Sequence, residues 1–218
     1  YRTAGMSSDF AKGTRESNLK SNFDNGVTAE FWLKKAAFDI SDTEKEVILD
    51  IWNNEATSSD SYGRITIELD GTSGTSPFLI TVQSGTVSAS VFLESIGQDI
   101  TTATLQDWGH YAFRFYNTGS TFVAKLHVNG QLNDTNRYAS SAISEITMPA
   151  MIARLGSLVT APSGSSAVAG DGTLSASIDE FRFWKVNRNS RQIGLRYFTN
   201  VGDGDNTDIS NTELGVYY

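Results

Sequence analysis

Two carboxylates at alternate positions of a strand are the first arrangement in this sequence that could support catalysis, because such side chains project from the same face. Glu68 and Asp70 have this spacing. Two carboxylates on one face can serve as the general acid and the nucleophile of a glycoside hydrolase. The stretch runs directly into Asp70-Gly71, a dipeptide typical of turns. We therefore interpret both side chains as solvated charges at the end of a strand.

The two histidines, His110 and His127, offer no stronger catalytic context. A Ser–His–acid site needs a histidine beside an activated nucleophile, often on a Gly-x-Ser-x-Gly turn. The sequence contains no such turn. His110 falls at the start of an apolar strand, and His127 lies near a hairpin turn, where we expect it to face solvent. The sequence thus predicts a protein without catalytic activity.

Surface aromatic residues are the stronger candidates for binding, since the C–H faces of sugars stack on rings while nearby polar groups contact the hydroxyls. If the apolar residues of the strands face the core, Trp52 and Trp184 fall on the polar faces, which is unusual for large rings. The same faces carry the polar residues Asp50, Arg114, Tyr116, Lys125, His127 and Arg182. We predict a carbohydrate-binding surface from this set. The alternative is that both rings lie beneath a neighbouring loop or at a contact between subunits.

Short strands would position these side chains, since apolar and polar residues alternate with a period of two through much of the chain. About ten strands with turns every 8–12 residues are typical of a sandwich or jelly roll. Asn129-Gly130 suits the positive φ angles of a type I′ turn, and Ser84-Gly85 marks a second hairpin. The clearest alternation covers residues 47–52, 64–69, 78–83, 86–94, 112–116, 122–128, 131–134 and 180–184.

One short helix is expected at residues 189–199. Asn189 or Ser190 can cap its start, and Gly202 can end it. All other regular structure is predicted to be β-strand, so the fold class is all-β.

The chain is expected to form a single domain within a longer polypeptide. Residues 24–200 make up the domain, 1–23 a lead-in segment and 201–218 an exit segment. The sequence stops within an apolar, strand-like run at 215–218, which is why we expect more chain to follow.

The composition excludes several classes of protein. The 218 residues include no cysteine, so disulfide scaffolds and cysteine-bound zinc or iron–sulfur centres are ruled out. A net charge of -8, from 17 Lys+Arg and 25 Asp+Glu, argues against nucleic acid as a partner. No run approaches the ~20 apolar residues that a membrane-spanning helix needs, so membrane insertion is not expected.

Four blocks of sequence follow one another in a characteristic order: GVTAEFWLKK at 26–35, LQDWGHYAFRFYN at 105–117, KLHVNGQL at 125–132 and SIDEFRFWKVNRNSRQIG at 177–194. Together they resemble the laminin-G-like group of the concanavalin A-like lectin/glucanase superfamily. The resemblance implies a two-sheet antiparallel jelly-roll sandwich, with Trp32 and Trp108 packed in the core. The tail, residues 194–218, resembles the segment that follows such domains in structural proteins of tailed bacteriophages.

The resemblance also implies a structural calcium ion. Glucanases with this fold often hold calcium through an Asp at the start of the last strand and residues near the N-terminus. The matching positions are Asp179 and, as its partner, Asp24 or Asn25. Asp179 could equally accept hydrogen bonds from backbone amides at a strand edge, and both interpretations stay open. The Glu-x-Asp-x-Glu run of the glucanases is absent, and the acidic residues within 203–208 do not complete an EF-hand loop.

These observations predict a non-catalytic carbohydrate-binding or adhesion module of a larger extracellular or virion-surface protein. Attachment of a phage to host polysaccharide would be one such setting. The alternative is a purely structural or decorating module that contacts other protein subunits in a particle. The third hypothesis is an unrecognised glycoside hydrolase that depends on Glu68.

Overall fold

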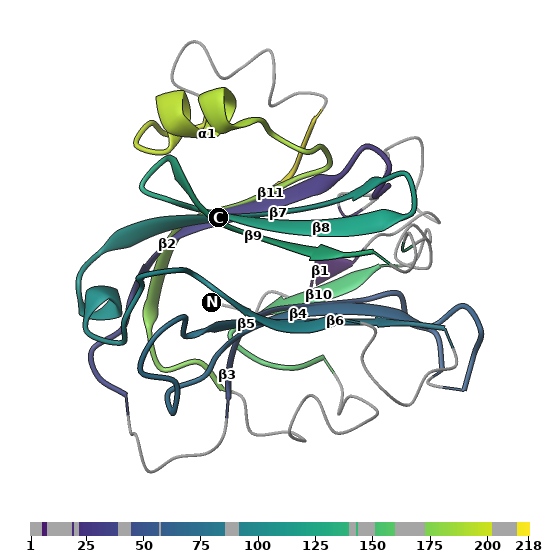
Figure 1. Ribbon diagram of the computed structural model, residues 1–218, viewed down its shortest axis with the longest axis horizontal. Coiled ribbons are helices and arrows are strands. Elements are labelled where there is room, and N and C mark those ends of the chain that lie inside the picture. Colours follow the sequence, from purple (N-terminus) through teal and green to yellow (C-terminus); the bar gives the residue numbers. More distant parts are fainter. Residues whose placement is uncertain are drawn as a thin grey trace.

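The computed structural model describes residues 6–7, 19, 22–38, 45–56, 58–85, 92–139, 143, 151–159, 173–201 and 213–218. Within these residues the chain forms two antiparallel sheets that face each other, and one short helix lies outside the upper sheet in Figure 1. The predicted all-β jelly-roll sandwich with one short C-terminal helix is therefore confirmed.

Sheet A and sheet B each contain six strands in the described part of the chain. Sheet A has the order β1 (Met6–Ser7), β10 (Ile152–Leu155), β3 (Glu46–Trp52), β4 (Gly63–Leu69), β5 (Phe78–Ser84) and β6 (Phe92–Ile96). Sheet B has the order β12 (Leu214–Tyr217), β11 (Ser177–Trp184), β2 (Val27–Lys34), β7 (Gly109–Thr118), β8 (Thr121–Val128) and β9 (Gln131–Tyr138). A short 3-10 helix, η2 (Thr104–Gln106), precedes β7. Of the predicted strand 86–94, residues 86–91 lie outside the described residues.

Alternate residues of the strands fill the space between the sheets, as the period-two pattern predicts. Phe31 of β2 and Phe113 of β7 stack with ring centroids 5.9 Å apart. Phe78 of β5 meets Phe113 edge-on across the sandwich at 5.2 Å. All three rings are fully buried, and burial of each such ring stabilises the fold by roughly 1.5–3 kcal/mol. The aromatic residues of facing strands therefore hold the two sheets together.

The β8–β9 hairpin turns at Asn129-Gly130, where φ is 48° and 80°. Both residues adopt the positive φ that the dipeptide predicts for a type I′ turn. Beyond the turn, Asp134 reaches across to sheet A, and its Oδ2 accepts hydrogen bonds from the N–H groups of Gly97 and Gln98 at 3.0 and 3.2 Å. These bonds close the sandwich along the side of β6 and β9.

Helix α1 (Ser190–Arg196) begins with a capping box. The side chain of Asn189 accepts from the N–H of Gln192 at 2.9 Å, and the side chain of Gln192 accepts from the N–H of Asn189 at 2.8 Å. The predicted cap at Asn189 is confirmed. The helix is shorter than the predicted 189–199, because Thr199 N–H already donates to the Arg196 carbonyl in a turn. No helix in the described residues has the length and apolarity to span a membrane.

Both ends of the chain contribute strands. β1, within the expected lead-in segment, pairs with β10, and β12, within the expected exit segment, pairs with β11. Gly202 and the acidic residues within 203–208 lie outside the described residues.

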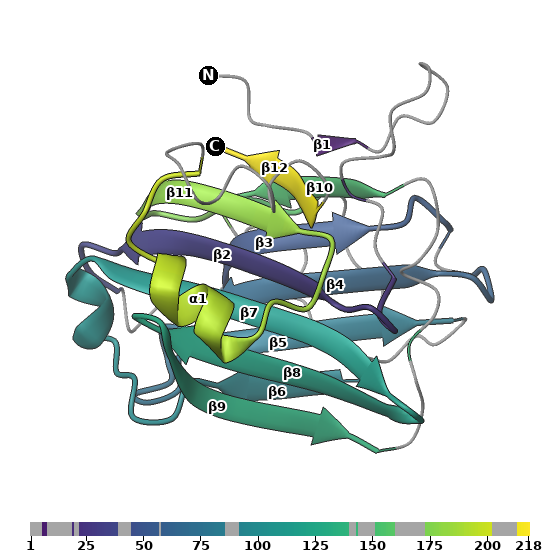
Figure 2. The same ribbon diagram turned by 90° about the horizontal axis from the view of Figure 1, so that it is seen from above.

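Seen from above in Figure 2, α1 and the segment that leads to it cross the outer face of sheet B. We call residues 185–199 the cover segment. It is tied to β2 and the residues before it, because Asn187 N–H donates to the Asn25 carbonyl at 3.0 Å and Arg188 N–H donates to Thr28 Oγ1 at 3.0 Å. The part of the outer face of sheet B that lies beneath the cover segment therefore becomes a second buried layer, separate from the core.

Candidate functional site

The layer beneath the cover segment is charged. Glu30 of β2 lies at its centre, and its Oε1 accepts hydrogen bonds from Trp184 Nε1 at 2.6 Å and Arg188 Nη1 at 2.8 Å. The Arg188 guanidinium also lies over the Trp184 ring, 4.0 Å from its centroid. Arg182 Nη1 lies 3.7 Å from the same Glu30 oxygen. Each of these residues is at most 1% exposed, so Glu30 neutralises cations whose burial alone would be costly.

This layer contains most of the side chains that strand alternation assigns to the polar face. The assigned face is correct, but the expected exposure is wrong. Trp184, Arg182 and His127 are at most 1% exposed, and Arg114 is 7% exposed. His127 does not face solvent, since its Nε2 lies 3.0 Å from Ser190 Oγ at the start of α1. The physical reason is the cover segment, and for Trp184 the alternative of burial beneath a neighbouring segment is the one observed.

Tyr116 lies beside Arg114 on the same face of β7. The Arg114 guanidinium is 5.7 Å from the centroid of the Tyr116 ring, and Lys125 Nζ is 5.9 Å from it. Arg114 Nε also donates to Asn187 Oδ1 at 2.8 Å, which links β7 to the cover segment. Three residues of the predicted set, Arg114, Tyr116 and Lys125, therefore meet, but the two cations already contact the ring.

Both histidines are uncharged at neutral pH. Burial, followed by the nearby guanidinium groups of Arg182 and Arg188, lowers the pKa of His110 to about 3. Burial, followed by two nearby cations, lowers the pKa of His127 to about 4. The layer beneath the cover segment thus holds both imidazoles in their neutral form.

The outer face of sheet A carries a second buried polar cluster, around Asp50. Asp50 is 0% exposed and accepts hydrogen bonds from Arg64 Nε at 2.8 Å, from Arg64 Nη2 at 2.5 Å and from Val159 N–H at 2.7 Å. Trp52, on the same strand, is half-buried, and its Nε1 donates to the Glu55 carbonyl at 3.0 Å. The Asp50 carboxylate is therefore already bonded to Arg64 and to the backbone at Val159. Of Asp50 and Trp52, only the Trp52 ring is partly exposed to solvent.

Glu68 lies on this same face and is 1% exposed, so the interpretation of Glu68 as a solvated strand-end charge is wrong. The reason is that β4 is a central strand, and polar side chains of the neighbouring strands β3 and β5 lie around the carboxyl group. Burial raises the pKa of Glu68 to about 7, and Thr81 Oγ1 lies 3.4 Å from its Oε2. Asp70 differs, because it lies in the following turn, where its Oδ1 accepts the N–H of Thr72 at 3.0 Å.

Asp24 and Asp179 lie near opposite ends of β2. Asp179 is paired with Trp32 near the end of β2, whereas Asp24 precedes the strand and accepts from Asn117 Nδ2 at 3.2 Å. The strand between these positions spans roughly 17 Å. The Oδ1 of Asp179 accepts the N–H of Glu180 at 2.9 Å.

The two aspartates do not fit a shared calcium site at this separation. Among the described residues, no group of three or more His, Cys, Asp or Glu side chains could hold a metal ion.

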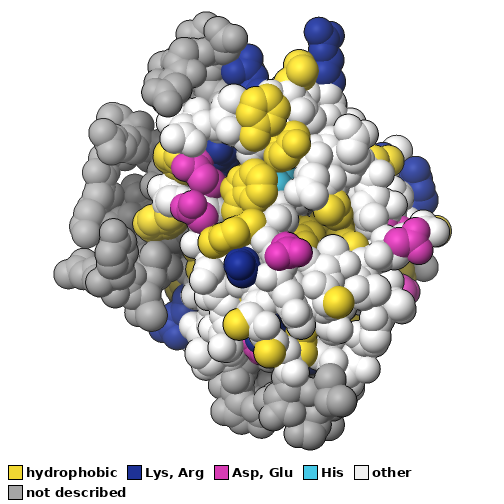
Figure 3. Space-filling view, turned by 90° about the vertical axis from the view of Figure 1, so that its left-hand side faces the viewer, with side chains coloured by type: hydrophobic (Ala, Val, Ile, Leu, Met, Phe, Trp, Pro, Cys, Tyr) yellow, Lys and Arg dark blue, Asp and Glu magenta, His cyan; other side chains and the backbone are white. Residues whose placement is uncertain are grey.

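An exposed group of rings occupies the end of sheet B where β2 finishes and β7 begins. We call it the aromatic patch: Trp32, Trp108 directly before β7, and Tyr197 and Phe198 directly after α1. Trp108 is 47% exposed and Phe198 is 65% exposed, while the other two rings are half-buried. Figure 3 shows this end of the molecule, on which hydrophobic side chains gather in a band.

Ring contacts and one hydrogen bond give the patch a fixed base. Trp32 Nε1 donates to the Tyr197 carbonyl at 3.3 Å, and the two ring centroids are 6.1 Å apart. His110 lies against both rings, at 5.6 Å from Trp32 and 5.4 Å from Tyr197. The Phe198 ring stands nearly perpendicular to Tyr197, at 85° and 5.1 Å. The base is therefore packed, while Phe198 stays open to solvent.

Exposed polar side chains accompany the patch. The exposed polar residues within two positions of its rings are Lys34, Gln106, Asp107 and Asn200. Open rings beside hydrogen-bond donors and acceptors form the kind of surface that binds sugars.

Sequence reasoning misplaced Trp184, which is buried, and Trp108, which is exposed, whereas Trp52 is half-buried on the outer face of sheet A. The resemblance implied that Trp32 and Trp108 are core residues, yet Trp108 is 47% exposed and Trp32 lies on the outer face. The signal for Trp32 is strand parity, since it alternates with the core residues Phe31 and Leu33. For Trp108, the sequence feature that could have indicated exposure is its position directly before Gly109, the first residue of β7, and so outside the strand.

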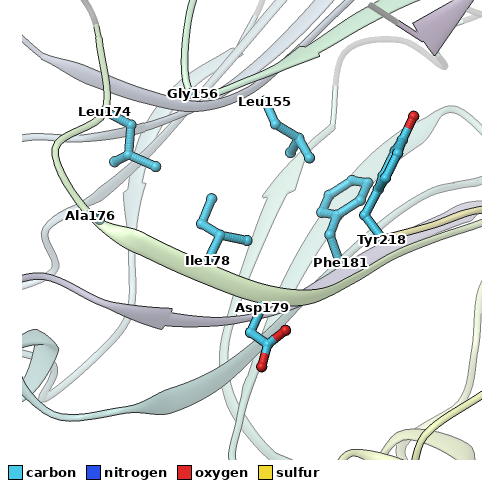
Figure 4. Close-up of a pocket in the computed structure, with 8 residues that line it drawn as sticks. All are labelled: Leu155, Gly156, Leu174, Ala176, Ile178, Asp179, Phe181 and Tyr218. Atoms are coloured by element: carbon cyan, nitrogen blue, oxygen red, sulfur yellow. The ribbon is translucent and has the colours of Figure 1, made fainter. Parts of the chain in front are cut away.

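An apolar pocket of about 510 Å³ opens between the sheets, beside β10 and β11. In Figure 4, Ile178 and Phe181 of β11 point into it, whereas Asp179 points away from it on the other side of the strand. Its lining consists of Leu155, Gly156, Leu174, Ala176, Ile178, Asp179, Phe181 and Tyr218. Binding pockets combine apolar walls with a few converging polar groups. Here the polar side chains of the lining are those of Asp179, which points away, and Tyr218, so we assign no function to the pocket.

Known proteins share the fold of this chain. No protein-family model and no curated protein matches the sequence. A candidate carbohydrate-binding protein from Bacteroides ovatus ATCC 8483 matches with a TM-score of 0.51 and 16% identity, over 90% of this chain and 46% of that one. The enzymatically active domain of tailspike protein 2 from bacteriophage CBA120 matches with a TM-score of 0.50 and 12% identity, over 91% and 27%. This chain spans less than half the length of either structure, and the likeness shows a common fold.

Proposed function

We propose that this chain is a non-catalytic carbohydrate-binding module and that the aromatic patch is its binding surface. The observation that carries the proposal is the pair of exposed rings, Trp108 at 47% and Phe198 at 65%, beside a packed base of Trp32 and Tyr197. Large rings are usually buried, so a cluster in which two rings stay exposed to solvent beside two packed rings indicates a binding surface. A sugar would stack on the rings and form hydrogen bonds with the flanking polar side chains.

The absence of catalysis is part of the proposal. Glu68, the carboxyl group with the raised pKa, is buried, and Asp50 is engaged by Arg64. The two histidines are buried as well. None of these groups is at the patch surface where a bound glycan would lie, except that His110 contacts the patch from beneath.

We further propose that the module belongs to a larger extracellular or virion-surface protein and serves in adhesion, for example to host polysaccharide. The resemblance of residues 194–218 to phage structural proteins supports this setting. The fold shared with a phage tailspike domain agrees with it. The alternative, a structural or decorating module, would use the same rings to contact another protein subunit.

A glycan array probed with the full chain tests the proposal. We expect the unmodified chain to bind one class of glycan. Trp108→Ala and Phe198→Ala should each weaken this binding about tenfold or more, as expected for the loss of an aromatic hot spot. Leu93→Ala is the matched control, because Leu93 is 45% exposed but lies on β6 of the other sheet. The control should bind as the unmodified chain does.

Three outcomes would contradict the proposal. A silent array, together with self-association that Trp108→Ala abolishes, would favour the structural module. Binding that survives both patch substitutions but is lost in Trp52→Ala would move the site to sheet A. Release of sugar from a polysaccharide, lost in Glu68→Gln, would establish a hydrolase.

A further inference from the structure

Arg182 is a buried residue of β11 that makes two of its hydrogen bonds to the segment carrying half of the aromatic patch. Its Nη1 donates to the Arg196 carbonyl at 3.3 Å, and its Nη2 donates to the Thr199 carbonyl at 2.5 Å. These two carbonyls bracket Tyr197 and Phe198. One guanidinium group therefore holds both ends of the turn that presents the two rings.

The chemistry of this contact requires arginine. The last carbonyls of a helix have no partners within the helix, and a cation at that end interacts favourably with them. The planar guanidinium presents several donors in fixed directions, so it can bind two carbonyls and a carboxylate at once. A lysine ammonium at position 182 would keep the charge but could not span the same groups.

Arg182 is held in turn from the side of the edge strand β12. Glu180 Oε2 accepts from Arg182 Nη2 at 2.8 Å, and the Tyr217 hydroxyl donates to the Glu180 carboxylate at 2.7 Å. The Arg182 guanidinium also lies 5.8 Å from the centroid of the Tyr217 ring. A continuous set of contacts thus runs from β12 through Glu180 and Arg182 to the turn at 196–199.

An irregularity in β11 accompanies these contacts. The register between β11 and β2 shifts between Asp179 and Arg182, and Glu180 has a φ of 50°, in the left-handed region that favours glycine. Bulges of this kind re-aim side chains, and residues other than glycine keep such a conformation only where their surroundings require it. Here the irregularity lies where Glu180 meets Arg182 and Tyr217.

We propose that Arg182 is the positioning residue of the aromatic patch, and that β12 is required for glycan binding although the patch contains no residue of β12. The inference rests on the proposed function and names a part of the chain on which that function depends.

Indole N–H signals in ¹H–¹⁵N spectra test the positioning directly. Trp32 Nε1 reports on the turn because it donates to the Tyr197 carbonyl, and Trp52 Nε1 is an internal control because it donates to the Glu55 carbonyl beside the other sheet. A Trp32→Phe variant assigns the first signal. In Arg182→Lys, the Trp32 signal should move and exchange faster with solvent, while the Trp52 signal stays in place. Tyr217→Phe, which removes one hydroxyl group, should shift the Trp32 signal in the same direction by less.

Binding to a glycan found on the array supplies the second readout. We expect an affinity about tenfold lower in Arg182→Lys and a few-fold lower in Tyr217→Phe, since charged hydrogen bonds are lost in the first and one neutral donor in the second. Arg191→Met is the matched control, because Arg191 is exposed at the start of the same helix. The control should change neither readout.

Two results would overturn the inference. One is a Trp32 signal that stays in place in both Arg182→Lys and Tyr217→Phe. The other is an unchanged glycan affinity in both variants although that signal has moved. If the unmodified chain binds no glycan, the proposed function fails, whereas the Trp32 signal still decides whether Arg182 positions the patch. Should Arg182→Lys fail to fold, Tyr217→Phe alone decides both readouts.

Discussion

Glu30 is the residue on which the covered face of sheet B depends most. A single carboxylate oxygen serves both Trp184 and Arg188, and all three residues are at most 1% exposed. Removing one partner of a buried ion pair leaves the other charge without compensation. We therefore expect the covered face of sheet B to lose stability when this carboxylate is removed.

Glu30→Gln should lower the free energy of unfolding by about 3–5 kcal/mol, because Arg188 would keep its buried charge without a counter-charge. Urea denaturation measures the change. Glu94→Gln, at an exposed position on β6, is the control and should change stability by less than about 0.5 kcal/mol. A loss below about 1 kcal/mol in Glu30→Gln would show that another group compensates Arg188.

The histidines make the fold sensitive to acid. In the folded chain the pKa of His110 is about 3 and that of His127 about 4, against an ordinary value of 6.5. As the pH falls below 6.5, the unfolded chain binds two protons that the folded chain does not, so stability decreases. Glu68 acts in the opposite sense, because its raised pKa of about 7 lets the folded chain hold a proton between pH 4.5 and 7. Its stabilising effect is full below pH 4.5 and is lost as the pH rises through about 7.

Taken together, these three groups bind about one proton more in the unfolded chain than in the folded chain between pH 5 and 6. The free energy of unfolding should therefore fall by ~1.4 kcal/mol as the pH drops from 6 to 5. Urea denaturation at the two pH values measures this slope. Glu68→Gln removes the opposing group, and the slope should then double to ~2.7 kcal/mol per pH unit. Stability that rises between pH 6 and pH 5 in the unmodified chain would contradict the account.

Among the elements, the β8–β9 turn shapes the patch together with the cover segment. A Cβ atom at Gly130 would lie 2.7 Å from the Tyr197 ring and 3.0 Å from the Gly194 Cα. Gly130 also has a φ of +80°, so two separate demands favour glycine there. The close approach lets the Tyr197 ring pack against the turn and complete the base of the patch.

Gly130→Ala and Gly119→Ala separate these two demands. Gly119 has a φ of +58°, and a Cβ atom there would have no neighbour within 4 Å, so alanine should cost only the ~1–2 kcal/mol of the left-handed backbone. Gly130→Ala should cost a further ~1–3 kcal/mol, because the Tyr197 ring must move. Thermal or urea unfolding compares the two variants, and glycan affinity should fall only in Gly130→Ala. Equal losses of stability would contradict this role of the turn.

For the whole molecule, the features that sequence predicts are those determined by near neighbours in the chain. Period-two alternation predicts the strands. The dipeptide Asn129-Gly130 predicts the β8–β9 turn, and Asn189 predicts the start of α1. Exposure on the outer faces depends on distant segments instead: Trp184 and the Glu30 that binds it are 154 residues apart. Alternation therefore places Trp184 off the core but cannot show that the cover segment buries it.

The same limit explains the patch. Its rings come from β2, from the residue before β7 and from the turn after α1, and only the pairing of β2 with β7 and the docking of α1 bring them together. Core positions were predictable because every strand turns one of its two faces toward the space between the sheets. The aromatic patch was not predictable, because Tyr197 and Phe198 belong to the cover segment and meet Trp32 only when that segment docks on sheet B.

The central claim, that the aromatic patch binds carbohydrate, is tested most directly by titrating the ¹⁵N-labelled chain with an oligosaccharide that responds on the array. The indole signals of Trp32 and Trp108 should shift together and saturate at the Kd that calorimetry gives for the same sugar. The Trp184 signal should not move, because its ring is 0% exposed. A titration in which the Trp52 signal shifts while Trp32 and Trp108 stay in place would contradict the claim.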